Sequence, residues 1–372
     1  YYNEIIDSIV EYRSAQTMIV EFARTISSLA VDHLHIIGDI FDRGPKPHLI
    51  MDFLMTHRNV DIQWGNHDVV WMGAACGNWA CIANIIRMNV SYNNFDMLEY
   101  GYSINLRPLA TLAEKIYKGD ECKAFWPHVL DKNRFDPIPE DLAAKMHKMI
   151  AICQFKIEGQ IIQAHPEMHL EKRLLLDKID FENGTVEVEG TVYPLKDTNL
   201  PTIDPADPYR LSPEEEEVMI ALEASILRSD KLQEHIQFLY SHGALYKTLN
   251  GNLMFHGCIP FTEDGEFRDV TINGITQHGA KLMEHLDKEL RDAYFNPPKG
   301  KTRAEAANLM WYLWLGPDSP LFGKDKMTTF ERLFIADKAT HKEHVVPYYR
   351  LINQKDICVK MIRDFGLDAS HG

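Results

Sequence analysis

The chain has 372 residues, 45% hydrophobic and 25% charged, which is typical of a folded protein and excludes a disordered chain, a collagen-like fibre and a small disulfide scaffold. Lys and Arg total 39 and Asp and Glu total 54, so the net charge is −15. Phosphate groups would repel a chain this acidic. We therefore expect no nucleic-acid partner and no membrane partner.

The cysteines indicate a cytoplasmic protein, and the most apolar segment indicates a buried helix. Six cysteines occur without a CxxC pair, which favours reduced, buried thiols. The most apolar run, Val69–Ile86, is interrupted by Gly and Asn residues and falls short of the ~20 apolar residues of a membrane span. We expect a buried helix there.

Helices and strands alternate in the first part of the chain. Residues 15–31 have helical spacing of apolar side chains, and residues 33–37 form an apolar, extended run. Residues 46–57 are again helical in pattern, and residues 60–64 read as a second strand. A strand, helix, strand order predicts a parallel sheet with helices packed on it.

The middle of the chain is expected to be mainly helical, with hairpins. Residues 153–157 and 160–163 flank Glu158-Gly159 and are interpreted as one hairpin, and residues 186–192 as another. Residues 195–210 are rich in Pro and Asp and read as a loop. Ser212, followed by Pro213 and Glu215, is a typical helix start with a capping box.

The last part of the chain contains one further strand, residues 252–255, which ends at His256-Gly257. The aromatic cluster of Trp311, Tyr312 and Trp314 is expected in the core. We expect three parts: residues 1–100 and 246–372 form an α/β domain, and residues 101–245 form a mainly helical insertion.

Two polar motifs follow the two predicted parallel strands. Residues 38–44 read GDIFDRG and residues 65–68 read GNHD. Ligands of open α/β sheets bind at the carboxyl ends of the strands, so both loops are expected to face one crevice. Turn-forming Asp and Asn would explain either motif alone, but not both at this spacing.

The side chains of these motifs fit phosphoryl transfer. Asp39 offers a carboxylate that can bridge two divalent cations, and Asn66 offers an amide oxygen to one of them. His67 offers a titratable imidazole, whose tautomer either Asp42 or Asp68 could fix. Arg43 offers a planar fork suited to phosphate oxygens. Together they describe a two-metal site at which cations and Arg neutralise developing charge.

These motifs resemble those of the calcineurin-like metallophosphoesterases. The resemblance implies an α/β fold with a β-sandwich flanked by helices (αββα). It also implies that Asp39 bridges the metals, Asn66 ligates the second metal, His67 protonates the leaving oxygen with support from Asp42, and Arg43 holds phosphate.

The same family has a later His ligand, usually followed by Gly. His256 has the preceding strand and the His-Gly step, and we favour it. His165 is the alternative, although Pro follows it. His33 and His35 lie within a predicted strand and are interpreted as sheet or core residues.

Several stretches resemble the class III fructose-1,6-bisphosphatases of Firmicutes, and the similarity covers nearly the whole chain. They include residues 38–68, 174–179, 250–260 and 319–332. The resemblance implies hydrolysis of the 1-phosphate of fructose 1,6-bisphosphate, a gluconeogenic step in the cytoplasm. It implies a dinuclear Mn²⁺ site, with Mg²⁺ or another divalent cation as the alternative. The oligomeric state stays open, and a homo-oligomer is allowed.

A sugar bisphosphate needs cations for its second phosphate, and Lys324, Lys326 and Arg332 are the candidates. The alternative is a solvated charged surface. The Asp-x-His motif of the family does not occur in residues 1–37, and the chain stops at His371-Gly372, so we expect the catalytic sheet to be incomplete at both termini. The rival functions are a protein or dinucleotide phosphatase on the same metal site, and a catalytically degenerate binding or regulatory chain.

Overall fold

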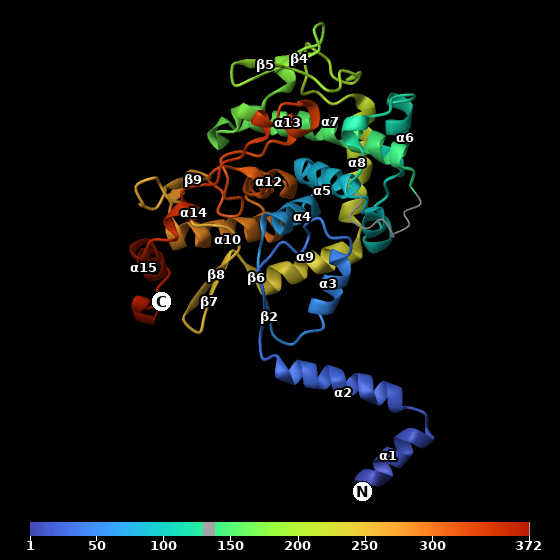
Figure 1. The fold of residues 1–372 in the computed structure, drawn as a ribbon, viewed down its shortest axis with the longest axis vertical. Helices are drawn as coiled ribbons and strands as arrows, with labels where there is room; N and C mark the ends of the chain where they lie inside the picture. The colour runs from blue at the N-terminus through green and yellow to red at the C-terminus, as the bar shows by residue number, and fades with distance from the viewer. Residues whose placement is uncertain (129–137, 372) are drawn as a thin grey trace.

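The computed structural model describes residues 1–128 and 138–371 and has an α/β fold (Figure 1). Two N-terminal helices, α1 (Tyr2–Glu11) and α2 (Ala15–Ala30), stand away from the body of the molecule in Figure 1. No helix among these residues combines the length and apolarity needed to cross a bilayer. The helix predicted over residues 15–31 is confirmed.

A small parallel sheet positions the two motifs. Its strands are β1 (Leu34–Ile36), β2 (Val60–Gln63) and β6 (Gly243–Ala244), in the order β1-β2-β6. Helix α3 (Pro47–Leu54) connects β1 to β2, so the predicted strand, helix, strand unit is confirmed. The third strand was not predicted, because two residues carry no periodic signal.

The apolar run Val69–Ile86 forms two buried helices rather than one. Helix α4 (Asn66–Ala75) begins within the second motif, and α5 (Trp79–Ser91) follows it. The break occurs at Gly77, whose φ is +85°, and Asn78, whose side chain accepts a hydrogen bond from the Cys81 amide at 2.9 Å. The run is buried as predicted, but it forms two helices where one was expected.

The hairpin predicted over residues 153–163 is wrong, because the segment lies inside the 25-residue helix α7 (Glu140–Ala164). Gln154, Lys156 and Glu158 alternate with apolar residues, which resembles a half-buried strand, but all three are buried in this helix. Gly159 is not a turn residue. A Cβ there would collide with the ring of Tyr209, so glycine allows the Tyr209 ring to pack against the helix.

The second hairpin, the loop and the helix start predicted for the middle segment are confirmed. Strands β4 (Thr185–Val188) and β5 (Thr191–Pro194) form an antiparallel hairpin, with β3 (Ile179–Asp180) beside β4. Residues 195–210 contain no helix. Helix α8 (Pro213–Leu227) begins with the capping box of Ser212 and Glu215, whose reciprocal bonds measure 3.2 and 2.7 Å.

The C-terminal part contains a further antiparallel hairpin and several helices. The predicted strand 252–255 is confirmed as β8, but it pairs antiparallel with β7 (Tyr246–Leu249), outside the parallel sheet. The aromatic cluster lies buried in α12 (Asn308–Leu315), which packs against α4. The remaining helices and strands are α6 (Arg107–Ile116), α9 (Asp230–His242), β9 (Val270–Ile272), β10 (Ile275–Gln277), α10 (Gly279–Phe295), α11 (Arg303–Ala306), α13 (Thr329–Phe334), α14 (Tyr348–Leu351) and α15 (Lys355–Asp364).

The α/β class is therefore confirmed, whereas the β-sandwich stays a prediction. The described residues hold two three-stranded and two two-stranded sheets. The six cysteines are free, and five are buried, as expected of inert thiols. Burial raises the pKa of Cys76 and of Cys258 to about 12.

Candidate metal and phosphate site

The loops that follow β1 and β2 interlock through two glycines. Gly38 has a φ of +87°, and a Cβ on it would lie 2.6 Å from the amide nitrogen of Gly65. A Cβ on Gly65 would collide with Oδ1 of Asp39 and lie 2.6 Å from the Asp39 nitrogen. Glycine at both positions lets the two motifs approach, as their placement after neighbouring parallel strands predicted.

The Asp68 carboxylate links the two loops by accepting hydrogen bonds from their backbone amides. It therefore does not fix the tautomer of His67. Its Oδ2 accepts hydrogen bonds from the amides of Asp39 at 2.8 Å and Gly65 at 2.9 Å, and its Oδ1 accepts one from Phe41 at 3.3 Å. Burial raises the pKa of Asp68 to about 6, although the amides of Gly65 and Phe41 oppose the shift. Of the two residues that could support His67, Asp68 is occupied by backbone hydrogen bonds, which leaves Asp42.

Asp39 and His256 lie side by side at the centre of the site. Nε2 of His256 is 3.3 Å from Oδ2 of Asp39, and the His67 amide donates to Oδ1 of Asp39 at 3.2 Å. His256 Nδ1 donates to the carbonyl oxygen of Ile37 at 2.5 Å, which leaves Nε2 facing Asp39. The carbonyl contact fixes the imidazole in the orientation that a metal ligand requires.

The electrostatics of this pair favour a bound cation. Burial opposes a charge on His256, yet the hydrogen bond and the charge of Asp39 raise its pKa to about 9. Burial also opposes ionisation of Asp39, but its contacts with His256 and His67 lower its pKa overall. The pair therefore binds a proton tightly where a divalent cation would fit.

Asn66 is held by the backbone of α12. Its Nδ2 donates to the carbonyl oxygen of Trp314 at 3.2 Å, which leaves the amide oxygen available as a ligand. The Trp314 ring also packs edge-on against His67, with centroids 4.7 Å apart. Sequence reasoning placed Trp314 in the core and missed this second role, because nothing in the local sequence links α12 to the GNHD loop.

His67 faces Asp42, as the resemblance implied. Its Nε2 lies 3.2 Å from Oδ1 of Asp42, while its Nδ1 is buried without a hydrogen-bond partner among residues 1–128 and 138–371. Burial lowers the pKa of His67, and the charges of Asp39 and Asp42 oppose the shift. The imidazole is thus kept neutral next to two carboxylates that would stabilise it once protonated.

Arg43 stands at the open side of the site. Its side chain is 59% exposed, its Nε lies 3.5 Å from Oδ1 of Asp42, and its guanidinium lies 5.7 Å from the Tyr92 ring centroid. Asn94 donates to the Arg43 carbonyl oxygen at 3.1 Å and fixes the backbone there. The guanidinium can therefore reach an incoming anion without leaving a buried partner.

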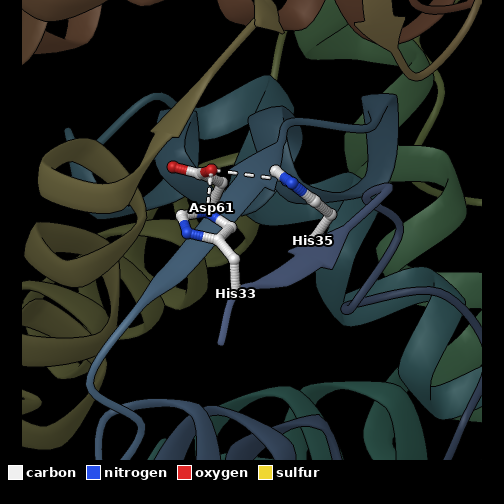
Figure 2. Close-up of side chains that lie close together, drawn as sticks. All are labelled: His33, His35 and Asp61. Carbon is white, nitrogen blue, oxygen red and sulfur yellow. Dashed lines mark hydrogen bonds and ion pairs between the residues drawn. The ribbon is translucent and has the colours of Figure 1, made fainter. Parts of the chain in front are cut away.

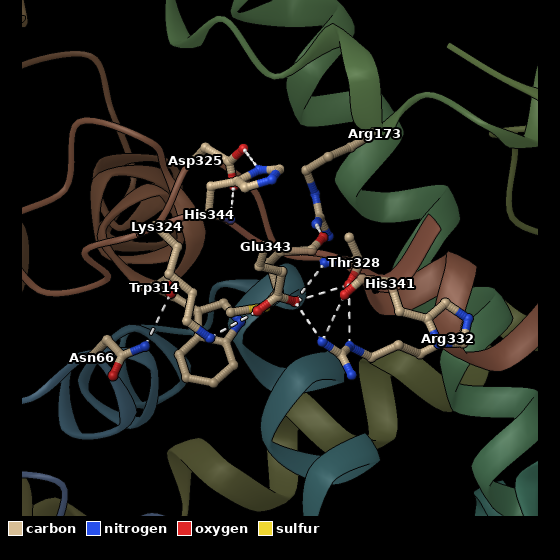
Figure 3. Close-up of polar contacts among 11 residues, drawn as sticks. Asn66, Arg173, Trp314, Lys324, Asp325, Thr328, Arg332, His341, Glu343 and His344 are labelled. Carbon is tan, nitrogen blue, oxygen red and sulfur yellow. Dashed lines mark hydrogen bonds and ion pairs between the residues drawn. The ribbon is translucent and has the colours of Figure 1, made fainter. Parts of the chain in front are cut away.

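The three basic residues predicted to bind the second phosphate are all paired with carboxylates. Figure 3 shows Lys324 and Arg332 approaching Glu343, at 2.8 and 3.4 Å. Lys326 lies 3.1 Å from Glu189. Arg332 also donates to the carbonyl oxygen of His341 at 3.0 Å. These contacts neutralise the cluster, and none of them joins it to Asp39, Asn66 or His67.

The structure distinguishes between the two candidates for the later His ligand. His256 contacts Asp39, whereas His165 follows α7 and lies 2.9 Å from Glu167. His165 lines a cavity of about 330 Å³ with residues of β9 and α12. The geometry therefore supports the preference for His256.

Comparison with known proteins gives one family. The sequence model of Firmicute fructose-1,6-bisphosphatase matches residues 1–372. The chain belongs to this family. It is 52% identical over 368 residues to a fructose-1,6-bisphosphatase class 3 of Clostridium tetani (strain Massachusetts / E88), covering 99% of this chain and 55% of that protein. It is 50% identical over 375 residues to the protein of the same name in Alkaliphilus metalliredigens (strain QYMF), covering 100% and 56%.

The chain thus spans about half the length of the curated relatives it matches. No solved protein structure matches it with significance. The resemblance to the class III fructose-1,6-bisphosphatases of Firmicutes is confirmed.

Proposed function

We propose that this protein hydrolyses the 1-phosphate of fructose 1,6-bisphosphate to give fructose 6-phosphate and inorganic phosphate. The observation that carries the proposal is the convergence of Asp39, His67 and His256, which come from three separate segments. The names of the curated relatives support the substrate. The residues of the site support phosphoryl transfer but do not themselves select a sugar.

We propose a dinuclear Mn²⁺ site, with Mg²⁺ or another divalent cation as the alternative. Asp39 would bridge the ions, and Asn66 and His256 would ligate them. The donor set fits, because the Asp39 carboxylate and the His256 imidazole lie side by side and the imidazole is already oriented by the Ile37 carbonyl. The hydrogen bond from Asn66 Nδ2 to Trp314 leaves the Asn66 amide oxygen available as a third donor. When bound, the cations would polarise the phosphoryl oxygens and neutralise the charge that develops on them.

In this proposal His67 carries the proton and Arg43 holds the phosphate. In its protonated form His67 gives its proton to the departing sugar oxygen, and the attacking water releases its own proton to solvent. Asp42, 3.2 Å away, stabilises the imidazolium before that transfer. Arg43 presents its guanidinium to the phosphoryl oxygens from the exposed side.

The second phosphate of the substrate is assigned to Lys324, Lys326 and Arg332. These cations already have carboxylate partners, so the phosphate must compete with Glu343 and Glu189 for them. We also propose that the complete protein has the helix-flanked β-sandwich of the metallophosphoesterases and acts in gluconeogenesis in the cytoplasm. The family match supports both statements.

The test is phosphate release with Mn²⁺ from three substrates: fructose 1,6-bisphosphate, a phosphoserine peptide and a dinucleotide. It is run on this chain and on the longest form that the gene encodes. We expect release of one phosphate per sugar and little from the other two. Faster hydrolysis of the peptide or the dinucleotide would make the protein one of the rival phosphatases. No hydrolysis by either form, with one or no Mn²⁺ bound, would favour a binding or regulatory chain.

A further inference from the structure

A second group of side chains able to ligate a metal comes from strand β1, the residue just before it and strand β2. His33 and His35 are two residues apart, so the extended backbone points both imidazoles to the same face. Asp61 on β2 stands directly opposite His35 in the parallel register. Figure 2 shows the two imidazoles and the carboxylate turned toward one another.

The ligand atoms are close enough for one ion to contact all three. One nitrogen of each imidazole and one Asp61 oxygen lie within 4.8 Å of one another. His33 Nε2 contacts Oδ2 of Asp61, and His35 Nδ1 lies 3.3 Å from the same oxygen. His35 Nδ1 is buried and makes no hydrogen bond within the described part of the chain. An ion with bonds of about 2.0–2.2 Å would satisfy that nitrogen.

Lys247 on β7 completes the surroundings of the cluster. Its Nζ pairs with Oδ1 of Asp61, the oxygen that does not face the histidines. Burial opposes ionisation of Asp61, but the hydrogen bonds from Lys247 and His33 lower its pKa. Lys247 therefore holds the carboxylate ionised and fixes its rotation, as outer-shell partners of metal ligands do.

We propose that His33, His35 and Asp61 bind one Zn²⁺ ion. Two imidazoles and a carboxylate suit Zn²⁺ better than the hard cations that prefer oxygen ligands alone. Three protein ligands would leave the fourth tetrahedral position open for water or another small ligand. The histidines stand before Gly38 in the chain and share no residue with the Asp39 site. A simple His–carboxylate ion pair is the competing interpretation.

The test is Zn²⁺ titration by calorimetry in the Asp39→Asn/His256→Ala double variant, which lacks two ligands of the Asp39 site. We expect one equivalent of Zn²⁺ to bind. His35→Gln in this background should weaken binding by at least ~100-fold, the upper end of what outer-shell changes cost. His344→Gln is the matched control, because His344 is an exposed histidine 3.0 Å from Asp325, and it should leave binding unchanged. Circular dichroism checks that each variant folds.

X-ray absorption of the zinc-loaded double variant provides a second measurement that needs no change in the cluster. We expect two imidazole nitrogens and a carboxylate oxygen around the ion. Failure of the double variant to bind Zn²⁺, survival of binding in His35→Gln, or a coordination shell without imidazole would each overturn the proposal and leave the cluster as an ion pair. Because Zn²⁺ binding is measured without substrate, its failure is distinguishable from failure of the phosphatase proposal.

Discussion

Two clusters of residues that we propose to bind metal lie at or next to strands β1 and β2, and they are built in different ways. The loop cluster, Asp39, Asn66 and His256, depends on backbone contacts, because Gly38, Gly65 and the Asp68 clamp bring its segments together. The strand cluster, His33, His35 and Asp61, depends only on side-chain alternation and strand register. A loop site therefore leaves a motif in the sequence, whereas a strand site leaves only two histidines and a distant carboxylate.

The clusters also differ in their cationic neighbours. Arg43 lies on the exposed side of the loop cluster, and the backbone amide of His67 contacts Asp39. This arrangement suits the binding of an anion. The strand cluster has Lys247 bound to its own carboxylate, so that charge is already neutralised. We therefore expect phosphate chemistry at the loop cluster alone, and the following predictions test that difference.

The largest expected effect is on turnover. His67→Ala should lower kcat for fructose 1,6-bisphosphate by ~10²–10⁴, because a general acid–base group is lost. The measurement is steady-state phosphate release by the longest active form of the protein. His344→Ala, an exposed histidine beside Asp325, is the control and should keep wild-type kcat. An unchanged kcat in His67→Ala would remove His67 from the mechanism.

The next prediction tests whether the loop cluster depends on the close approach of the two motif loops while the strand cluster does not. Gly65→Ala should destabilise the protein by ~1–3 kcal/mol and abolish Mn²⁺ binding, because its Cβ would collide with Asp39. Gly44→Ala is the matched control from the first motif, since a Cβ there meets nothing within 4 Å. Denaturant unfolding and Mn²⁺ titration measure both. Zn²⁺ binding at the strand cluster should survive in Gly65→Ala, and its loss would mean that the clusters are not independent.

A smaller effect tests how far the loop cluster extends toward the second phosphate. Lys324→Met should raise KM for fructose 1,6-bisphosphate ~10-fold with kcat unchanged, the scale of one charge-assisted hydrogen bond. Lys342→Met, which changes an exposed lysine outside the predicted phosphate-binding set, is the control. A wild-type KM in Lys324→Met would assign Lys324 to its ion pair with Glu343 alone.

The remaining effect is a pH dependence of stability in that same cluster. Burial opposes ionisation of Glu343, but hydrogen bonds from Lys324 and Thr328 lower its pKa from 4.5 to about 2. A carboxylate with a lowered folded-state pKa stabilises the fold above its unfolded pKa of 4.5, and this contribution is lost as the pH falls toward 2.

The free energy of unfolding of wild type and Glu343→Gln, followed by urea titration from pH 7 downward, checks this sign. The gap between them should be constant above about pH 5 and shrink below it. Glu263→Gln removes an exposed ion pair with Arg350 and should change the free energy by no more than ~0.5 kcal/mol at any pH. A gap that widens as the pH falls would contradict the assignment.

The parts of the molecule that the sequence predicted well are those with local signals. Strands β1 and β2, helix α3 and the capping box at Ser212 each follow from patterns within a few residues. The approach of the two motif loops was predicted for the same reason, because Asp39 and Asn66 sit in short motifs directly after strands. His256 was favoured because the His-Gly step is also local.

The parts that were missed depend on contacts between distant segments. Gly159 reads as a turn until the Tyr209 ring is known to lie against it. Trp314 supports Asn66 and His67 through a contact that spans about two thirds of the chain. His33 and His35 read as sheet residues because Asp61 becomes their partner only through the strand register.

The most direct test of the loop cluster is anomalous X-ray diffraction at the manganese edge from crystals grown with Mn²⁺. The account predicts a peak in contact with Asp39, Asn66 and His256, and its disappearance in Asp39→Asn. Manganese bound elsewhere, with no density beside Asp39, would contradict the claim that the two motif loops build a metal-dependent phosphatase site.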